Sequence, residues 1–217
     1  MAATDESLQT TEVRWFISRV SRRLDRIAAG PGWCTAAPRT DRYLSVEGNH
    51  RVGLKLRDGK LEIKVQYASM GPLSFSPTFC GVVQRWSKWS SDVSGFDGLR
   101  KGLLLAGTGI DVRKHRRLLK LSFEGGAPLP VDLAASPMDG CTAELTELEC
   151  MGQTWWTFGL EAYGELETQR ANLISTAIHL CADAGAPELD ALTSCSYPQW
   201  VHRLAAEGVA APGHVRQ

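Results

Sequence analysis

Hydrophobic and charged residues alternate along two neighbouring runs in the first third of the chain. The runs are VGLKLR at residues 52–57 and KLEIKV at residues 60–65, and the pair Asp58-Gly59 separates them. A period of two is typical of β-strands that have one polar and one apolar face. Asp-Gly is a preferred pair in two-residue hairpin turns, because both residues must take positive φ. The pattern therefore predicts a β-hairpin over residues 52–65.

Six further runs carry strand signals, and three segments carry helical spacing. Enrichment in β-branched and aromatic residues, or alternation, predicts strands at residues 11–18, 39–48, 82–91, 112–124, 141–150 and 154–164. Apolar residues at helical spacing predict helices at residues 20–28 and 166–181, and a shorter one at residues 196–205. The Gly- and Pro-rich stretch 70–81 breaks the strand pattern, and residues 92–111 are interpreted as a loop.

About eight antiparallel strands in one chain need protection for their edges, and closure into a barrel removes the edges altogether. We therefore predict a mainly β (α+β) fold, a closed eight-stranded antiparallel β-barrel or tunnel with flanking helices. A chain of 217 residues suits one substantial domain. We place this single domain at residues 11–205, between flexible tails at residues 1–10 and 206–217.

Composition narrows the classes of function. The formal net charge is zero, so no global basic field draws the protein to nucleic acid or to an anionic membrane. The N-terminus lacks the layout of a secretory signal, and no stretch reaches the roughly 20 apolar residues that span a bilayer. The six cysteines form no C-x-x-C pair, which is typical of reduced thiols. We therefore expect a cytoplasmic protein without a membrane partner.

The sequence contains no P-loop, G-x-S-x-G elbow or H-E-x-x-H motif.

Lysine and arginine residues share faces of the predicted strands. Alternation places cations of the hairpin on the face opposite its aliphatic residues, and the run VRKHRR adds two more on one face. These cations are Lys55, Arg57, Lys64, Lys114 and Arg116. The run QRWSKW contributes either Arg85 or Lys88, and alternation leaves both open. One interpretation is a solvated outer face. The other turns the cations into the barrel, where they would hold an anion such as phosphate.

Acidic residues gather on the first strand and on the last two strands, at Glu12, Glu144, Glu147, Glu149 and Glu161. The first and last strands of a closed barrel can be neighbours, so these carboxylates could form one wall opposite the cations. Oxygen ligands of this kind suit Mg²⁺ or Mn²⁺ that is bound together with substrate phosphates. Salt bridges with neighbouring lysines and arginines are the alternative.

The order of these motifs resembles the CYTH superfamily of triphosphate tunnel proteins, which includes class IV adenylate cyclases and thiamine triphosphatases. The resemblance covers most of the chain, from Glu12 to about Trp200. It rests on EVRWF, GLKLRDGKLEIK, KHRR, VQRWSKWS, ELTELE, WTFGLEAYG and the terminal SYPQW. More narrowly, the pattern resembles a bacterial subgroup of uncharacterised CYTH-like proteins. The family's first strand carries E-x-E-x-K. Here Glu12 matches, whereas Arg14 replaces the second Glu and Phe16 replaces the Lys.

The resemblance implies a closed tunnel in which inward lysines and arginines hold a triphosphate and inward glutamates hold one or two divalent metals. Carried over by motif, the phosphate-binding residues would be Arg14, Lys55, Arg57, Lys64, Arg85, Lys88, Lys114 and Arg116. The metal ligands would be Glu12, Glu62, Glu149 and Glu161, with Mg²⁺ or Mn²⁺ as cofactor.

Three functions are compatible with these features. The first is binding, with metal-dependent hydrolysis, of a triphosphate- or polyphosphate-containing anion. The second is a tunnel that has lost the metal site and only captures a phosphorylated small molecule or nucleotide. The third is RNA binding by tryptophans interleaved with basic residues, as in RWSKW. Trp86, Trp89, Trp155 and Trp156 are more often core or barrel-wall residues.

Overall fold

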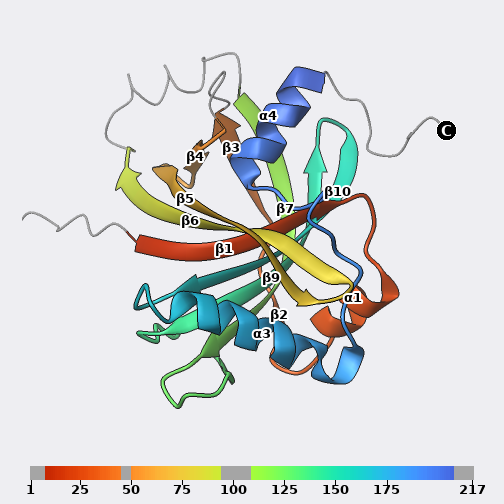
Figure 1. Cartoon of the computed structure of the whole chain (residues 1–217). Helices are drawn as coiled ribbons and strands as arrows, with labels where there is room; N and C mark the ends of the chain where they lie inside the picture. The colour runs from red at the N-terminus through yellow and green to blue at the C-terminus, as the bar shows by residue number, and fades with distance from the viewer. Residues whose placement is uncertain (1–7, 45–49, 94–108, 208–217) are drawn as a thin grey trace, which may run out of the picture.

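The computed structural model of the chain describes residues 8–44, 50–93 and 109–207. This part of the chain contains ten strands and three helices (Figure 1). The strands are β1 (Leu8–Ile17), β2 (Cys34–Thr35), β3 (Arg39–Leu44), β4 (Val52–Arg57), β5 (Lys60–Ser76), β6 (Phe79–Asp92), β7 (Gly109–Ser122), β8 (Leu129–Val131), β9 (Gly140–Cys150) and β10 (Gln153–Tyr163). The helices are α1 (Arg22–Ala28), α3 (Gln169–Ala184) and α4 (Tyr197–Glu207).

Eight of these strands form a closed antiparallel barrel. They are hydrogen-bonded in the order β7-β3-β4-β5-β6-β1-β10-β9, and β9 pairs back onto β7 to close the ring. The two short strands β2 and β8 both pair with β7 outside this ring. The predicted closed eight-stranded barrel is therefore confirmed. Closure also makes the first long strand, β1, a direct neighbour of the last, β10.

The predicted hairpin is present as β4 and β5. Asp58 and Gly59 take φ values of 49° and 76°, the positive values that their two-residue turn requires. Lys55 faces Glu62 across the pair, and Gly53 faces Lys64. The register therefore places the charged residues of both strands on one face.

Several predicted boundaries are wrong. The stretch 70–81 does not interrupt the strands, because β5 continues to Ser76 and β6 begins at Phe79. The β5–β6 pair accommodates the stretch through shifts in its register, as at β-bulges. Residues 8–10 belong to β1 rather than to a tail, and α4 continues through residue 207. Of the predicted loop 92–111, residues 92 and 109–111 lie in strands, and residues 94–108 lie outside the described residues.

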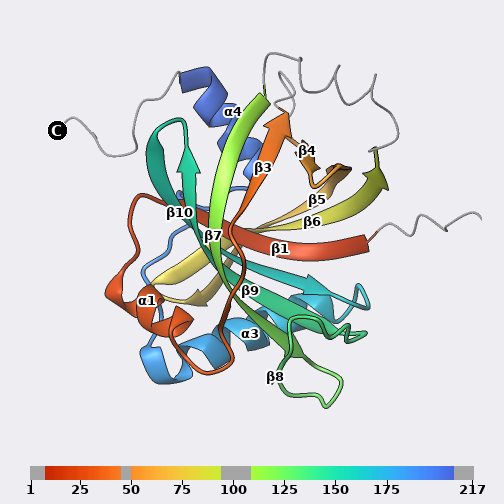
Figure 2. The same ribbon diagram turned by 180° about the vertical axis from the view of Figure 1, so that it is seen from behind.

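The outer face of β1, β10 and β9 carries most of the apolar core. Val13, Leu145 and Leu160 point away from the barrel interior and are fully buried. The helices α1 and α3 cover this face, and Leu24 and Leu173 belong to the same buried cluster. Figures 1 and 2 show α3 on one side of the barrel and α4 on the opposite side.

A second apolar cluster closes one end of the barrel. Phe16, Val112 and Leu148 point inward from β1, β7 and β9, and they pack with Trp200 and Val201 of α4. The rings of Phe16 and Trp200 stack with a centroid separation of 4.8 Å. Apolar side chains therefore occupy the outer face of β1, β9 and β10 and this end of the barrel, and the remaining interior is free to hold polar side chains.

The six cysteines are free thiols, of which only Cys34 is exposed. Within the described residues, no helix is long and apolar enough to cross a membrane.

Candidate functional site

A cavity of about 290 Å³ lies inside the barrel, and Tyr197 and Pro198 of α4 border it. Every strand of the closed ring contributes a charged side chain to its wall. The cations are Arg14, Arg39, Lys55, Arg57, Lys64, Lys88, Lys114 and Arg116. The carboxylates at the wall are Glu12, Glu62, Glu144 and Glu161. The charged rows of the strands therefore face one another around a shared interior rather than the solvent.

Most of the residues that the sequence singles out meet at this cavity. Arg85 and Glu149 do not, and their predicted placement in the site is wrong. Lys88 and the buried Trp86 point inward from β6, so Arg85 points outward and donates to the carbonyl oxygen of Leu166 at 3.4 Å.

Glu149 lies on the outer face of β9. Thr142 and Glu144 point inward, so residues of odd number in this stretch point outward. The side chain of Glu149 is 48% exposed, and its carboxylate pairs with Arg113 at 3.5 Å. The carboxylate that β9 supplies to the cavity is Glu144.

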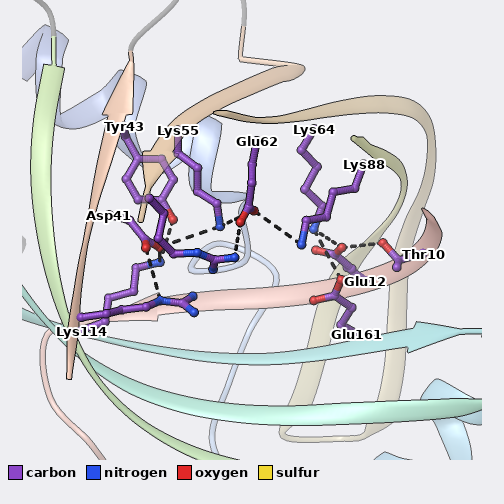
Figure 3. A network of polar contacts seen from close by, with 12 residues as sticks. Thr10, Glu12, Asp41, Tyr43, Lys55, Glu62, Lys64, Lys88, Lys114 and Glu161 are labelled. Carbon is purple, nitrogen blue, oxygen red and sulfur yellow. Dashed lines mark hydrogen bonds and ion pairs between the residues drawn. The ribbon is translucent and has the colours of Figure 1, made fainter. Parts of the chain in front are cut away.

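Asp41 and Arg39 belong to the site although sequence reasoning missed both. They alternate with Tyr43 on the inner face of β3, but Arg42 on the other face obscures the polar pattern. Asp41 is fully buried, and its carboxylate contacts Lys114 Nζ at 3.0 Å and Arg39 Nε at 3.2 Å (Figure 3). Burial raises the pKa of Asp41, but Lys114, Lys55 and Arg39 outweigh this effect and lower the pKa below its usual value.

Glu62 organises a second group of cations next to the first (Figure 3). Its carboxylate contacts Lys55 Nζ at 2.8 Å and Lys88 Nζ at 3.5 Å, and it also pairs with Arg57. Lys55 lies 3.8 Å from Asp41 and thereby links the two groups. Burial opposes the charged form of Glu62, but these cations outweigh it and lower the pKa of the carboxyl group. Because Lys114 of β7 pairs with Asp41, five neighbouring strands, β7 and β3 to β6, thus share one ion-pair network.

Lys114 is the most deeply buried cation of the wall. Its ammonium donates to Tyr43 Oη at 2.7 Å and lies 3.9 Å from the centre of the Tyr197 ring. Burial lowers the pKa of Lys114 to about 7, and Asp41 counteracts this shift only in part. The charge of this side chain therefore changes near neutral pH.

Three carboxylates form the opposite wall on β1, β10 and β9. Glu12 and Glu161 face each other across the β1–β10 pair, and Lys64 Nζ contacts Glu12 and lies 3.8 Å from Glu161 (Figure 3). Glu144 accepts a hydrogen bond from Arg14 Nη1 at 3.0 Å. Burial raises the pKa of Glu144, but Arg14 and Lys114 outweigh it and bring the pKa down to about 2.

These carboxylates do not fit the divalent metal that the resemblance implies. Mg²⁺ and Mn²⁺ need several oxygen ligands directed at one point. Among the residues that the structure describes, no group of three or more His, Cys, Asp or Glu side chains is arranged to hold a metal ion. Of the predicted ligands, Glu12 contacts Lys64, Glu62 is surrounded by three cations, and Glu149 lies outside. The donor set is that of an ion-pair network.

Arg116 differs from the other cations of the wall. No ion pair or hydrogen bond of its side chain is found within the described part of the chain, and its Nε is buried. Burial lowers the pKa of Arg116, and the neighbouring Arg39 adds to this effect. A buried donor without a partner is uncommon and indicates a place for an absent acceptor.

The four tryptophans singled out for the RNA interpretation differ in their burial. Trp86 and Trp155 are buried, and Lys64 Nζ lies 5.7 Å from the centre of the Trp86 ring. Trp89 and Trp156 are partly exposed.

Comparisons with known proteins give no family assignment. No family model matches the chain, and no curated protein matches it. Among solved structures, the chain is similar to the PH1012 protein of Pyrococcus horikoshii OT3, with 13% identity, a TM-score of 0.43, and coverage of 78% of this chain and 89% of that one. It is also similar to the PH1819 protein of the same organism, with 12% identity, a TM-score of 0.39, and coverage of 82% and 92%.

Proposed function

We propose that this chain is a CYTH-like tunnel protein that binds a triphosphate- or polyphosphate-containing anion inside its barrel. One observation carries the proposal: eight cationic side chains from six strands converge on a single cavity. The order of sequence motifs supports the same assignment. One guanidinium group can donate two parallel hydrogen bonds to a phosphate, and an ammonium group adds compact positive charge.

The charge balance of the cavity favours an anion with several negative charges. Eight cations face four carboxylates at the wall, and the buried Asp41 adds a fifth carboxylate. The interior therefore keeps a formal excess of three positive charges, although the whole chain is neutral. Charges that converge on a partly buried cavity attract a counter-ion more strongly than the same charges spread over the surface. An oligophosphate supplies the required negative charge in a compact form.

The ion-pair network prepares the wall for such a ligand. Lys55 and Lys114 are held by carboxylates, so their side chains lose little freedom when an anion arrives. Arg116 has its guanidinium at the cavity without a partner in the described residues, and it would be the first group to bind a phosphoryl oxygen. The proposal is confined to binding, because the donor set for the metal on which hydrolysis would depend does not fit.

The experiment compares two arginine variants by calorimetric titration with tripolyphosphate. Loss of a hydrogen bond to a charged group costs about 1.5–3 kcal/mol, so Arg116→Gln should weaken tripolyphosphate binding by roughly 10- to 150-fold. Among the described residues, no carboxylate forms an ion pair with Arg116, so this change leaves none of them unpaired. Arg85→Gln is the matched control on the outer side of the barrel, and it should bind like the wild type.

Equal affinities of the two variants would contradict the proposal. The same titration in the presence of single-stranded RNA tests the RNA interpretation. Tripolyphosphate should keep its affinity, because its binding groups line the inside of the barrel rather than its outer surface. Displacement of tripolyphosphate by RNA would favour the RNA interpretation.

A further inference from the structure

The ammonium group of Lys64 lies between the two carboxylates that would have to share a divalent metal. Glu12 and Glu161 are directly opposite in the β1–β10 register. Lys64 reaches them from β5 on the other side of the cavity, contacting Glu12 and lying 3.8 Å from Glu161. Thr10 Oγ1 also donates to Glu12 at 2.6 Å. The hydrogen bonds from Lys64 and Thr10 to Glu12 use lone pairs that a metal ion would need.

Arg14 neutralises Glu144, the third carboxylate of this wall, and the neighbouring strand β10 leaves space for the guanidinium group of Arg14. Its Nη1 donates to Glu144 at 3.0 Å and to Thr157 Oγ1 at 3.3 Å. Gly159 faces Arg14 across the β1–β10 pair, and a Cβ atom there would lie 2.6 Å from the guanidinium carbon. The guanidinium therefore occupies a space that a side chain at residue 159 would fill.

We propose that Lys64 and Arg14 serve as built-in counter-ions in place of a divalent metal, so that the tunnel takes its polyphosphate in the metal-free form. This inference rests on the proposed function. Glu12 and Glu144 would otherwise repel an anion, and Lys64 and Arg14 neutralise them from within the protein. A divalent cation that approached this wall would meet a positive charge at each carboxylate and would be repelled.

Magnesium should therefore compete with the protein. Mg²⁺ binds tripolyphosphate in solution and reduces its negative charge, so the complex is a poorer match for a cavity with excess positive charge. Titrations with tripolyphosphate in excess EDTA should show full affinity. Titrations with saturating Mg²⁺ should show an affinity that is lower by the factor by which Mg²⁺ depletes the free anion.

A second measurement tests the metal alone. Mn²⁺ added to the wild-type protein without any anion should keep the electron paramagnetic resonance signal of the free ion. The double variant Arg14→Glu with Lys64→Met removes both counter-ions and adds a carboxylate, and its folding is checked by circular dichroism. This variant should bind Mn²⁺ and reduce the free signal. Arg113→Glu makes the same charge reversal on the outer face of β7, beside Glu149, and should bind none.

The outcomes separate this inference from the proposed function. Binding that is lost in EDTA and strengthened at least about tenfold by Mg²⁺, or Mn²⁺ binding by the wild type, overturns the inference and leaves the proposed function in place. Absence of tripolyphosphate binding under both conditions overturns both. A folded double variant that gains no Mn²⁺ site overturns the role of the two cations. If that variant does not fold, the wild-type measurements decide.

Discussion

At the scale of single residues, the pair between Arg14 and Glu144 makes a stability prediction. Both side chains are largely buried, so Arg14→Gln leaves a charged carboxylate without its partner. Breaking a buried pair from one side costs about 3–5 kcal/mol, and urea denaturation should show a loss of this size near neutral pH. Arg23→Gln removes the exposed partner of Glu188 and should change stability by no more than about 1 kcal/mol. Equal losses in the two variants would contradict the buried role of Arg14.

The pH dependence of the Arg14 effect follows from the lowered pKa of Glu144. The folded pKa of about 2 lies below the ordinary value of 4.5. The stability that Glu144 contributes through its charged form is therefore present above pH 4.5 and is lost as the pH falls toward 2. The difference between the wild type and Arg14→Gln should shrink over this range.

Lys114 makes a separate prediction about proton uptake. Its folded pKa of about 7 lies below the ordinary value of 10.5, and the groups that face it are Asp41, Tyr43, Lys55, Glu144 and Tyr197. A bound polyanion favours the charged ammonium and raises this pKa, so binding takes up a proton and the affinity falls as the pH rises above 7.

Calorimetry in two buffers with different ionisation enthalpies measures this proton uptake. Lys114→Met should remove most of it. Lys120→Met is the control, because Lys120 donates to the carbonyl oxygens of Leu133 and Ala135 rather than into the cavity. If Lys114→Met still takes up a proton on binding, the proton uptake belongs to another group.

The alternation of side chains between the two faces of each strand decided which residues of the site could be predicted. In the β4–β5 hairpin, one face is charged and the other aliphatic, so alternation identified Lys55, Arg57 and Lys64. In β9, charged residues occupy both faces, and alternation alone could not separate Glu144 from Glu149. Which face is inward depends on pairing with distant strands, and a single sequence does not contain this information.

At the scale of elements, Gly81 explains why the stretch 70–81 was mistaken for a break. Glycine and proline usually interrupt strands, but here β6 runs through Gly81 because the indole of Trp15 packs against its backbone. A Cβ atom at residue 81 would lie 2.4 Å from the Trp15 ring and 2.6 Å from Val13. The glycine therefore provides space for a neighbouring strand, and its partner is 66 positions away in the chain.

Gly81→Ala tests this packing. Overpacking a core costs about 1–3 kcal/mol, so chemical denaturation should show a loss in this range. Gly125→Ala is the matched control, because nothing lies within 4 Å of a Cβ atom at that exposed turn, and its effect should stay within about 0.5 kcal/mol. A neutral Gly81→Ala would show that Trp15 moves aside without loss.

At the scale of the whole molecule, the barrel separates its charges by location. The outer face of β1, β9 and β10 is buried under α1 and α3, and α4 packs against one end, so the apolar surface is used there. The interior is left to charged residues with an excess of cations. Strand number and period made this closed architecture predictable, whereas composition alone concealed it, because the net charge is zero.

The spread of cations over six strands predicts that longer phosphate chains stabilise the fold more. Because the cations of the cavity lie on six strands, we expect tripolyphosphate to reach cations on more strands than pyrophosphate does, and a single phosphate to reach the fewest. A ligand that binds only the folded state adds about 2.7 kcal/mol at a hundredfold excess over its Kd. Thermal denaturation at equal ligand concentration should therefore rank the melting temperatures in the order tripolyphosphate, pyrophosphate, phosphate. Sodium chloride at matched ionic strength is the control, because it screens charges without filling the cavity. The differences in melting temperature between the three anions should become smaller in Arg116→Gln and stay unchanged in Arg85→Gln. Equal increases in melting temperature for all three anions would assign the effect to general anion binding.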